Sequence, residues 1–252
     1  RRDLNIWVKG KYLGGGNFGK VFRLTHRESG IKVAMKEVKM EPQYSELPEG
    51  VKQLENELVK LRRLSHPRIV RVHGSEQKGN FIYLFLDFMA GGSLRDFIRQ
   101  RGILDEQLTR EFTQQILEGV DYLHSNDIIH RDIKGPNVLL DSDRSVKLAD
   151  FGVSRTIQKI GTKTDLKSYV GTTYWMAPEI LWGKGYGRKV DIWSVGCTVV
   201  EMLTGDPPLR NLEPQAAMFC IGSKPLEVKL PESTEKARDF VRAALTWLVL
   251  MR

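Results

Sequence analysis

Residues 130–137 read HRDIKGPN, and this stretch decides which fold the sequence predicts. Asp132 and Asn137 are the third and the last residue of an HRDxxxxN pattern, which arises by chance in fewer than roughly one case in a hundred. We expect Asp132 to accept a proton from a hydroxyl group and Asn137 to offer an oxygen to magnesium. The stretch follows a segment whose apolar residues recur every three or four positions, which predicts an amphipathic helix. Those residues are Phe112, Ile116, Val120 and Leu123.

A second acidic motif, Asp150-Phe151-Gly152, comes directly after the strand-like residues 146–149. Asp150 is expected to hold magnesium, and Phe151 is expected to pack under a helix of the other half of the chain. From there to Glu179 the sequence is rich in Lys, Thr, Ser and Gly. A loop of this length has little structural justification, so a function for it is the better explanation.

Residues 14–19, GGGNFG, form a glycine cluster that fits three kinds of phosphate site. A dinucleotide-binding fold requires a helix after the cluster, and a P-loop requires Ser or Thr after Gly19-Lys20, where this chain has Val21. A strand-like segment follows instead, which favours a glycine loop between two strands whose backbone amides cover phosphates. The alternative is a flexible hairpin turn without a ligand.

Lys36 lies in the expected strand 31–38, where a lone lysine is usually just solvated. Glu57 changes this interpretation, because it lies beside the apolar stripe of an expected helix over residues 51–64. Its carboxylate should therefore face the interior, and a buried carboxylate needs a cationic partner. We expect Lys36 and Glu57 to pair, so that Lys36 is held to bind two phosphates of a nucleotide.

The predicted secondary structure changes from mainly strands to mainly helices near residue 90. Before it, strands are expected at 7–13, 21–24, 31–38 and 81–86, together with the helix over 51–64. After it, helices are expected around 112–123, 190–203 and 236–250. The prediction is an α+β fold with a small strand-rich lobe (1–86) that contains one helix. A hinge (87–92) joins it to a larger helical lobe (93–252).

The 252 residues carry a net charge of +8 and only two cysteines. The basic residues are spread along the chain and no recognition motif accompanies them, so nucleic-acid binding is not expected. No His and Cys cluster suggests a zinc site. No apolar run is long enough to span a bilayer, and the first residues do not resemble a signal peptide. We expect a cytoplasmic protein in a reducing compartment.

Taken in order, these motifs resemble the catalytic domain of eukaryotic protein kinases over nearly the whole chain. Further stretches are similar to the MEK-kinase branch of the MAP kinase kinase kinases: residues 91–94, 130–137, 171–179, 185–189 and 191–202. The resemblance implies a two-lobed fold that uses ATP and Mg²⁺. It also implies transfer of the γ-phosphate to serine or threonine of a protein substrate, namely a MAP kinase kinase.

The resemblance also assigns roles to single residues. Asp132 and Lys134 are expected to be catalytic, and Asn137 and Asp150 to bind the metal. Thr172, Glu179 and Asp191 are expected to be structural, with Thr172 hydrogen-bonded toward Asp132. The residues expected to bind ATP run from the glycine loop to the hinge, where Leu86 guards the adenine pocket: Leu13, Gly14, Gly16, Gly19, Val21, Ala34, Lys36, Glu57, Leu86, Asp87 and Met89.

Activity is expected to depend on phosphorylation of the segment between Gly152 and Ala177. Arg131 would be an unpaired cation beside Asp132 unless an anion docks there, and a phosphate can order a loop through an arginine. Ser168 is the first candidate for the modified residue and Thr164 the second. An upstream kinase, or autophosphorylation in trans, would add the phosphate.

Three features depart from the family pattern. Pro136 replaces the usual Ala next to Asn137, and Thr173 replaces a common proline. The family also pairs the residue matching Glu179 with an arginine near the end of the domain. The last residues here lack that context, so either the chain is truncated, or its end diverges and Arg252 or Arg242 reaches Glu179.

An active kinase is one hypothesis, and a pseudokinase that acts as a scaffold is the other. Loss of a catalytic residue would favour the pseudokinase, and none is lost. The five residues that decide this are Lys36, Glu57, Asp132, Asn137 and Asp150.

Overall fold

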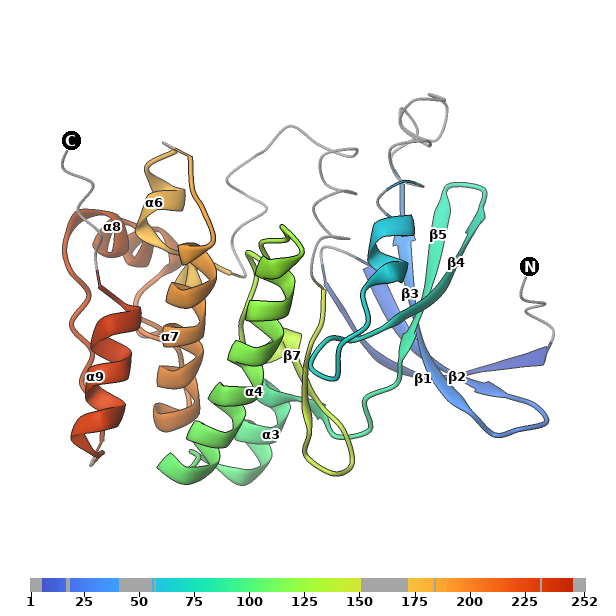
Figure 1. The fold of residues 1–252 in the computed structure, drawn as a ribbon, viewed down its shortest axis with the longest axis horizontal. Helices are drawn as coiled ribbons and strands as arrows, with labels where there is room; N and C mark the ends of the chain where they lie inside the picture. Colours follow the sequence, from blue (N-terminus) through green and yellow to red (C-terminus); the bar gives the residue numbers. More distant parts are fainter. Residues whose placement is uncertain are drawn as a thin grey trace. The chain divides into compact units, whose positions relative to one another are not determined.

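The computed structural model describes residues 6–16, 19–40, 56, 58–150, 172–183, 185–231 and 233–246. They divide into two compact units, of which the first contains the described residues up to Ala90 and the second those from Gly91 onward. The first unit is built on an antiparallel sheet, and the second is mainly helical (Figure 1). The α+β fold class predicted from the sequence is confirmed.

The first unit contains a five-stranded antiparallel sheet in the order β1-β2-β3-β5-β4. The strands expected at 7–13, 21–24, 31–38 and 81–86 are all present. The observed bounds are β1 (Trp7–Gly16), β2 (Gly19–His26), β3 (Lys32–Lys39), β4 (Val72–Lys78) and β5 (Phe81–Asp87). Of the helix expected over 51–64, the described residues 56 and 58–63 are helical and Leu64 is not.

One face of this sheet carries its apolar cluster. Phe22, Met35 and Phe85 stand opposite one another on β2, β3 and β5, so their side chains share a face. Leu24 and Val33 pair two residues further along, on the same face, and complete the buried cluster. Since side chains alternate between faces, the neighbouring residues of each strand point to the opposite side of the sheet.

The second unit contains six helices and a small sheet among its described residues. The helices are α3 (Leu94–Arg101), α4 (Glu106–Ser125), α6 (Pro178–Leu181), α7 (Lys189–Thr204), α8 (Pro214–Ser223) and α9 (Glu235–Ala244). The sheet has the order β6-β7-β8, with β6 (Gly92–Ser93), β7 (Val138–Leu140) and β8 (Val146–Leu148). There are also two 3₁₀ turns. In sequence, η2 (Gly135–Asn137) directly precedes β7, and η4 (Thr173–Trp175) precedes α6.

Helix α7 is the centre of the second unit. From Val190 to Leu203 every residue except Ile192 is buried, which matches the apolar sequence of this helix. It packs against α4 and α9 (Figure 1). The approach of α9 is close, since a Cβ on Gly196 would lie 2.8 Å from the Ala244 side chain.

Helix α4 forms from the stripe that the sequence predicts. Phe112, Ile116, Val120 and Leu123 are all buried in it. Asp105 caps its N-terminus by accepting a hydrogen bond from the Leu108 N–H.

Helix α9 is shorter than the helix expected over 236–250. It ends at Ala244, and the described residues Leu245 and Thr246 are not helical. No helix in the described part of the chain is long and apolar enough to cross a membrane.

Replacing Ile116 by alanine should test this core, because the side chain of Ile116 is fully buried on α4. The expected loss is about 2–5 kcal/mol of unfolding free energy, measured by urea denaturation. Ile103→Ala, at an exposed position of the same unit, is the control and should change it by about 0.5 kcal/mol or less. Equal losses in the two variants would show that the apolar stripe of α4 is not the core.

Candidate active site

The loop of residues 130–137, called the HRD loop below, is bound to α7 by a buried carboxylate. Asp191 lies in the first turn of α7 and its solvent exposure is 0%. Its Oδ2 accepts a hydrogen bond from the His130 N–H at 2.8 Å, and its Oδ1 accepts one from the Arg131 N–H at 2.7 Å. His124 Nε2 on α4 lies 2.7 Å from Asp191 Oδ2. The start of the loop is therefore fixed to two helices.

The HRD loop brings Asp132, Lys134 and Asn137 together, and Thr172 joins them. Asp132 Oδ1 lies 2.9 Å from Lys134 Nζ and accepts a hydrogen bond from Thr172 Oγ1 at 3.0 Å. Asp132 Oδ2 accepts one from Asn137 Nδ2 at 2.7 Å. Lys134 Nζ also donates to Thr172 Oγ1 at 2.8 Å. The hydrogen bond expected from Thr172 to Asp132 is present.

The side chain of Asn137 is oriented by these contacts. Its Nδ2 also donates to the Asp132 carbonyl at 2.8 Å, so both of its hydrogen bonds to Asp132 use the nitrogen. The amide oxygen is then the group available to a cation. Pro136 does not disturb this arrangement, because it stands at the start of the 3₁₀ turn η2, where a proline is tolerated.

Asp150 lies close to Asn137 along an adjacent segment. The Ala149 N–H donates to the Asn137 carbonyl at 2.9 Å, which places the residue before Asp150 beside the turn η2. A carboxylate and an amide oxygen are the hard donors that Mg²⁺ prefers, so these residues suit that ion. Asp150 and Arg131 both have left-handed backbones, with φ of 64° and 70°, a strained conformation that concentrates at functional sites.

In the first unit, four residues expected to bind ATP share one face of the sheet. Val21 pairs with Lys36, and Ala34 pairs with Leu86. Since Ala34 and Lys36 are two residues apart on β3, all four side chains project to the same side of the sheet. This is the face opposite the cluster of Phe22, Met35 and Phe85. The solvent exposure of Lys36 is 3%.

The glycine loop lies at the join of β1 and β2. Gly14 pairs with Val21 and Gly16 pairs with Gly19, and Leu13 precedes them on β1. Gly19 has a φ of 122°, and a Cβ there would collide with the Glu37 carbonyl, so glycine is required. The cluster therefore connects two strands and does not open a helix, which agrees with the prediction from the strand-like residues that follow it.

At the end of β5, the side chain of Asp87 is bound to residues of the same chain at the start of β4. Its Oδ1 lies 2.7 Å from His73 Nε2, and its Oδ2 accepts a hydrogen bond from the Arg71 N–H at 3.1 Å. Met89, two residues further on, is buried.

Several expected residues lie outside the described part of the chain: Glu57, Phe151, Gly152, Thr164, Ser168 and Arg252. Glu179 is described and half-buried, but it forms no ion pair with a described residue. Arg242 does not reach it, because its guanidinium pairs with Asp239 at 2.7 Å.

The structure adds two residues that the sequence did not single out, Tyr186 and Glu201. The guanidinium of Arg131 lies 5.3 Å from the centre of the Tyr186 ring, and its buried Nε has no hydrogen-bond partner in the part of the chain that the structure describes. Glu201 of α7 accepts a hydrogen bond from the Gly135 N–H within the HRD loop. The available sequence signal for Glu201 was a single carboxylate inside an apolar helical run.

The amino-acid sequence of this chain is also similar to those of known protein kinases. The chain is 46% identical over 240 residues to "Mitogen-activated protein kinase kinase kinase 3" of Mus musculus, which covers 94% of this chain and 38% of that protein. It is 44% identical over 249 residues to "Mitogen-activated protein kinase kinase kinase 19" of Homo sapiens, covering 96% of this chain and 19% of that protein.

A third relative is "Serine/threonine-protein kinase BCK1/SLK1/SSP31" of Saccharomyces cerevisiae, 44% identical over 233 residues, which are 90% of this chain and 16% of that protein. The chain thus spans well under half the length of these relatives. The family model described as "Protein kinase domain" matches residues 7–249. This chain belongs to the protein kinase family.

Proposed function

We propose that this chain is the catalytic domain of a MAP kinase kinase kinase, which transfers the γ-phosphoryl group of ATP to serine or threonine of a MAP kinase kinase. One observation carries the proposal: Asp132 is held by Asn137, Lys134 and Thr172 in a single hydrogen-bonded group. The relatives at 44–46% identity support the branch, since two of those described above bear the name of such a kinase.

In the proposed mechanism, Asp132 orients the substrate hydroxyl and accepts its proton as the hydroxyl oxygen bonds to the γ-phosphorus of ATP. The bond from that phosphorus to the bridging β-γ oxygen breaks in the same step, and ADP leaves. The ammonium group of Lys134 lies beside Asp132, so it can also offset negative charge on the transferring phosphoryl group. Thr172 donates to the same oxygen that Lys134 contacts and so limits the rotation of the carboxylate. This arrangement supports serine and threonine as acceptors.

Asn137 and Asp150 would hold Mg²⁺, which in protein kinases neutralises charge on the β- and γ-phosphates. The nitrogen of the Asn137 amide is engaged by Asp132, so its oxygen is presented as a ligand. The strained backbone at Asp150 is what an acidic ligand held at a defined position would require.

The nucleotide would lie against the sheet face that bears Val21, Ala34, Lys36 and Leu86. Lys36 would hold the α- and β-phosphates in partnership with Glu57, and the glycine loop would cover the phosphates with backbone amides. The adenine edge would bond the backbone near Asp87 and Met89, which we propose as the hinge. Among these, the burial of Lys36 is the supporting observation, because a buried ammonium needs an anionic partner.

A protein kinase of this branch would act in a signalling cascade in the cytoplasm. Its partners would be the substrate MAP kinase kinase and an upstream kinase, or a second copy for autophosphorylation in trans. The alternative, a scaffolding pseudokinase, is disfavoured because the polar contacts of Asp132 are complete.

Replacing Asp132 by asparagine should lower phosphotransfer to a MAP kinase kinase by about 10²-fold or more, because the hydroxyl loses its proton acceptor. Transfer of ³²P from ATP measures this, and the Kd for ATP should stay within about twofold, since Asp132 does not contact the nucleotide. Asp127→Asn is the control, because Asp127 is exposed and pairs only with Arg188 among the described residues. Equal turnover in wild type and Asp132→Asn would remove Asp132 from the mechanism.

Activity should also depend on phosphate in the segment that contains Thr164 and Ser168. Arg131 supports this proposal, because its buried Nε makes no hydrogen bond with a described residue and could bind a phosphate oxygen. The double variant Ser168→Ala, Thr164→Ala should lose at least about 90% of the wild-type turnover. Phosphatase treatment should reduce the wild type to the same level. Full activity of the double variant, with no phosphate found in this segment by mass spectrometry, would contradict the dependence.

A further inference from the structure

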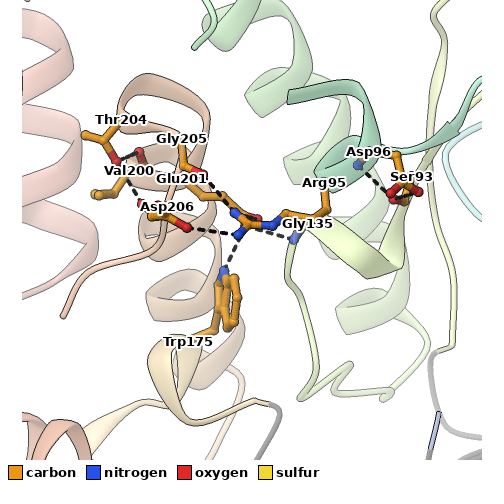
Figure 2. Close-up of polar contacts among 10 residues, drawn as sticks. All are labelled: Ser93, Arg95, Asp96, Gly135, Trp175, Val200, Glu201, Thr204, Gly205 and Asp206. Carbon is orange, nitrogen blue, oxygen red and sulfur yellow. Dashed lines mark hydrogen bonds and ion pairs between the residues drawn. The ribbon is translucent and has the colours of Figure 1, made fainter. Parts of the chain in front are cut away.

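Glu201 is a carboxylate buried near the end of the apolar helix α7, with a solvent exposure of 0%. Its Oε2 accepts hydrogen bonds from the Gly135 N–H at 3.0 Å and from the Trp175 indole N–H at 3.1 Å. Its Oε1 accepts one from the Arg95 guanidinium at 3.3 Å. Figure 2 shows the three donors converging on Glu201 from the HRD loop, η4 and α3.

This environment suits an ionised carboxylate. Burial raises the pKa of Glu201, while the Gly135 N–H, the charge of Arg95 and the Trp175 N–H act in the opposite direction. All three neighbours are hydrogen-bond donors, so a protonated carboxyl group would have no acceptor among them. The three donors therefore favour the charged form against the effect of burial, and Arg95 supplies the compensating positive charge.

Arg95 connects this carboxylate to the end of α7. Its Nη1 donates to the Gly205 carbonyl at 2.7 Å, and its Nη2 pairs with Asp206 Oδ1 at 2.9 Å. Gly205 is the residue that caps α7, where a cation is favoured by the helix dipole. The side chain of Arg95 is 17% exposed, so it forms a partly covered bridge from α3 to α7 (Figure 2).

The contact between Glu201 and Gly135 leaves no room for a side chain. A Cβ on Gly135 would lie 2.5 Å from Glu201 Oε1 and 2.8 Å from Oε2. Glycine at position 135 therefore lets the backbone N–H approach the carboxylate. Gly135 stands between Lys134 and Asn137, and both of these contact Asp132.

We propose that Glu201 and Arg95 are positioning residues for phosphotransfer, because they fix the backbone of the HRD loop at Gly135. The loop is then held at two places on α7, at its start by Asp191 and near its end by Glu201. Through Trp175, the same carboxylate holds η4, which directly follows Thr172. This inference rests on the proposed function, since it concerns the geometry of Asp132 and Asn137.

Two variants test the positioning without turnover. Glu201→Gln keeps the size of the side chain but turns an NH₂ group toward donors, and Arg95→Met removes the guanidinium. Arg242→Met is the control, because Arg242 is an exposed arginine paired with Asp239. Hydrogen–deuterium exchange of the Gly135 amide should become about tenfold faster or more in both variants. It should be unchanged in the control, as should exchange of residues 19–39 in all three proteins.

Steady-state kinetics with ATP and a MAP kinase kinase then test the consequence. Both variants should lower kcat by roughly 10- to 100-fold, with the KM for ATP within about twofold, because a misplaced loop affects the reacting geometry. Arg95→Lys should recover part of kcat, since it restores the charge without the paired N–H groups. If Glu201→Gln does not fold, Arg95→Met and Arg95→Lys test the positioning role instead. Arg95 is partly exposed, so replacing it is expected to disturb folding less than replacing the fully buried Glu201.

Two results would overturn the inference. One is unchanged exchange of the Gly135 amide in both Glu201→Gln and Arg95→Met. The other is a lowered melting temperature with kcat equal to the wild type, which would mean that the cluster only stabilises the fold. A wild-type protein that transfers no phosphate would instead contradict the proposed function, and the exchange experiment would still decide whether Glu201 positions the loop.

Discussion

The hydrogen bonds of the buried Asp191 carboxylate are the interaction on which the site depends. Removing a charge from water is costly, so this carboxylate is stable in an apolar helix only while donors surround it. Those donors are the backbone amides of His130 and Arg131 and the ring of His124. Because two of them belong to the HRD loop, the need to satisfy Asp191 also fixes the start of the loop that carries Asp132.

Glu201 repeats this arrangement ten positions further along α7, about 15 Å away at the rise of an α-helix. It too is a buried carboxylate satisfied by a backbone N–H of the HRD loop, with Arg95 and the Trp175 indole as further donors. An apolar helix with two buried acids thus acts as a rigid support for the HRD loop, whose only regular element among its residues is the short turn η2. Rigid support is what a constellation such as that of Asp132 requires to stay in its reactive geometry.

Much of this site could be predicted from the sequence because its residues lie close together in the chain. Asp132, Lys134 and Asn137 come from one stretch of eight residues, and Asp150 follows a short strand. The strands and α4 were predictable from the alternation and spacing of their apolar residues. Arg95 and Glu201 are 106 positions apart, and nothing in a local pattern indicates which of the many cations would neutralise a lone buried acid.

Under the proposed function, this chain is a serine/threonine kinase that acts on a MAP kinase kinase. The most direct measurement is phosphoamino-acid analysis of a MAP kinase kinase that has been incubated with the wild-type chain, Mg²⁺ and ³²P-labelled ATP. The account predicts label in phosphoserine and phosphothreonine of that substrate, and loss of the label when EDTA removes Mg²⁺. Label mainly in phosphotyrosine, or no label in any MAP kinase kinase offered, would contradict it.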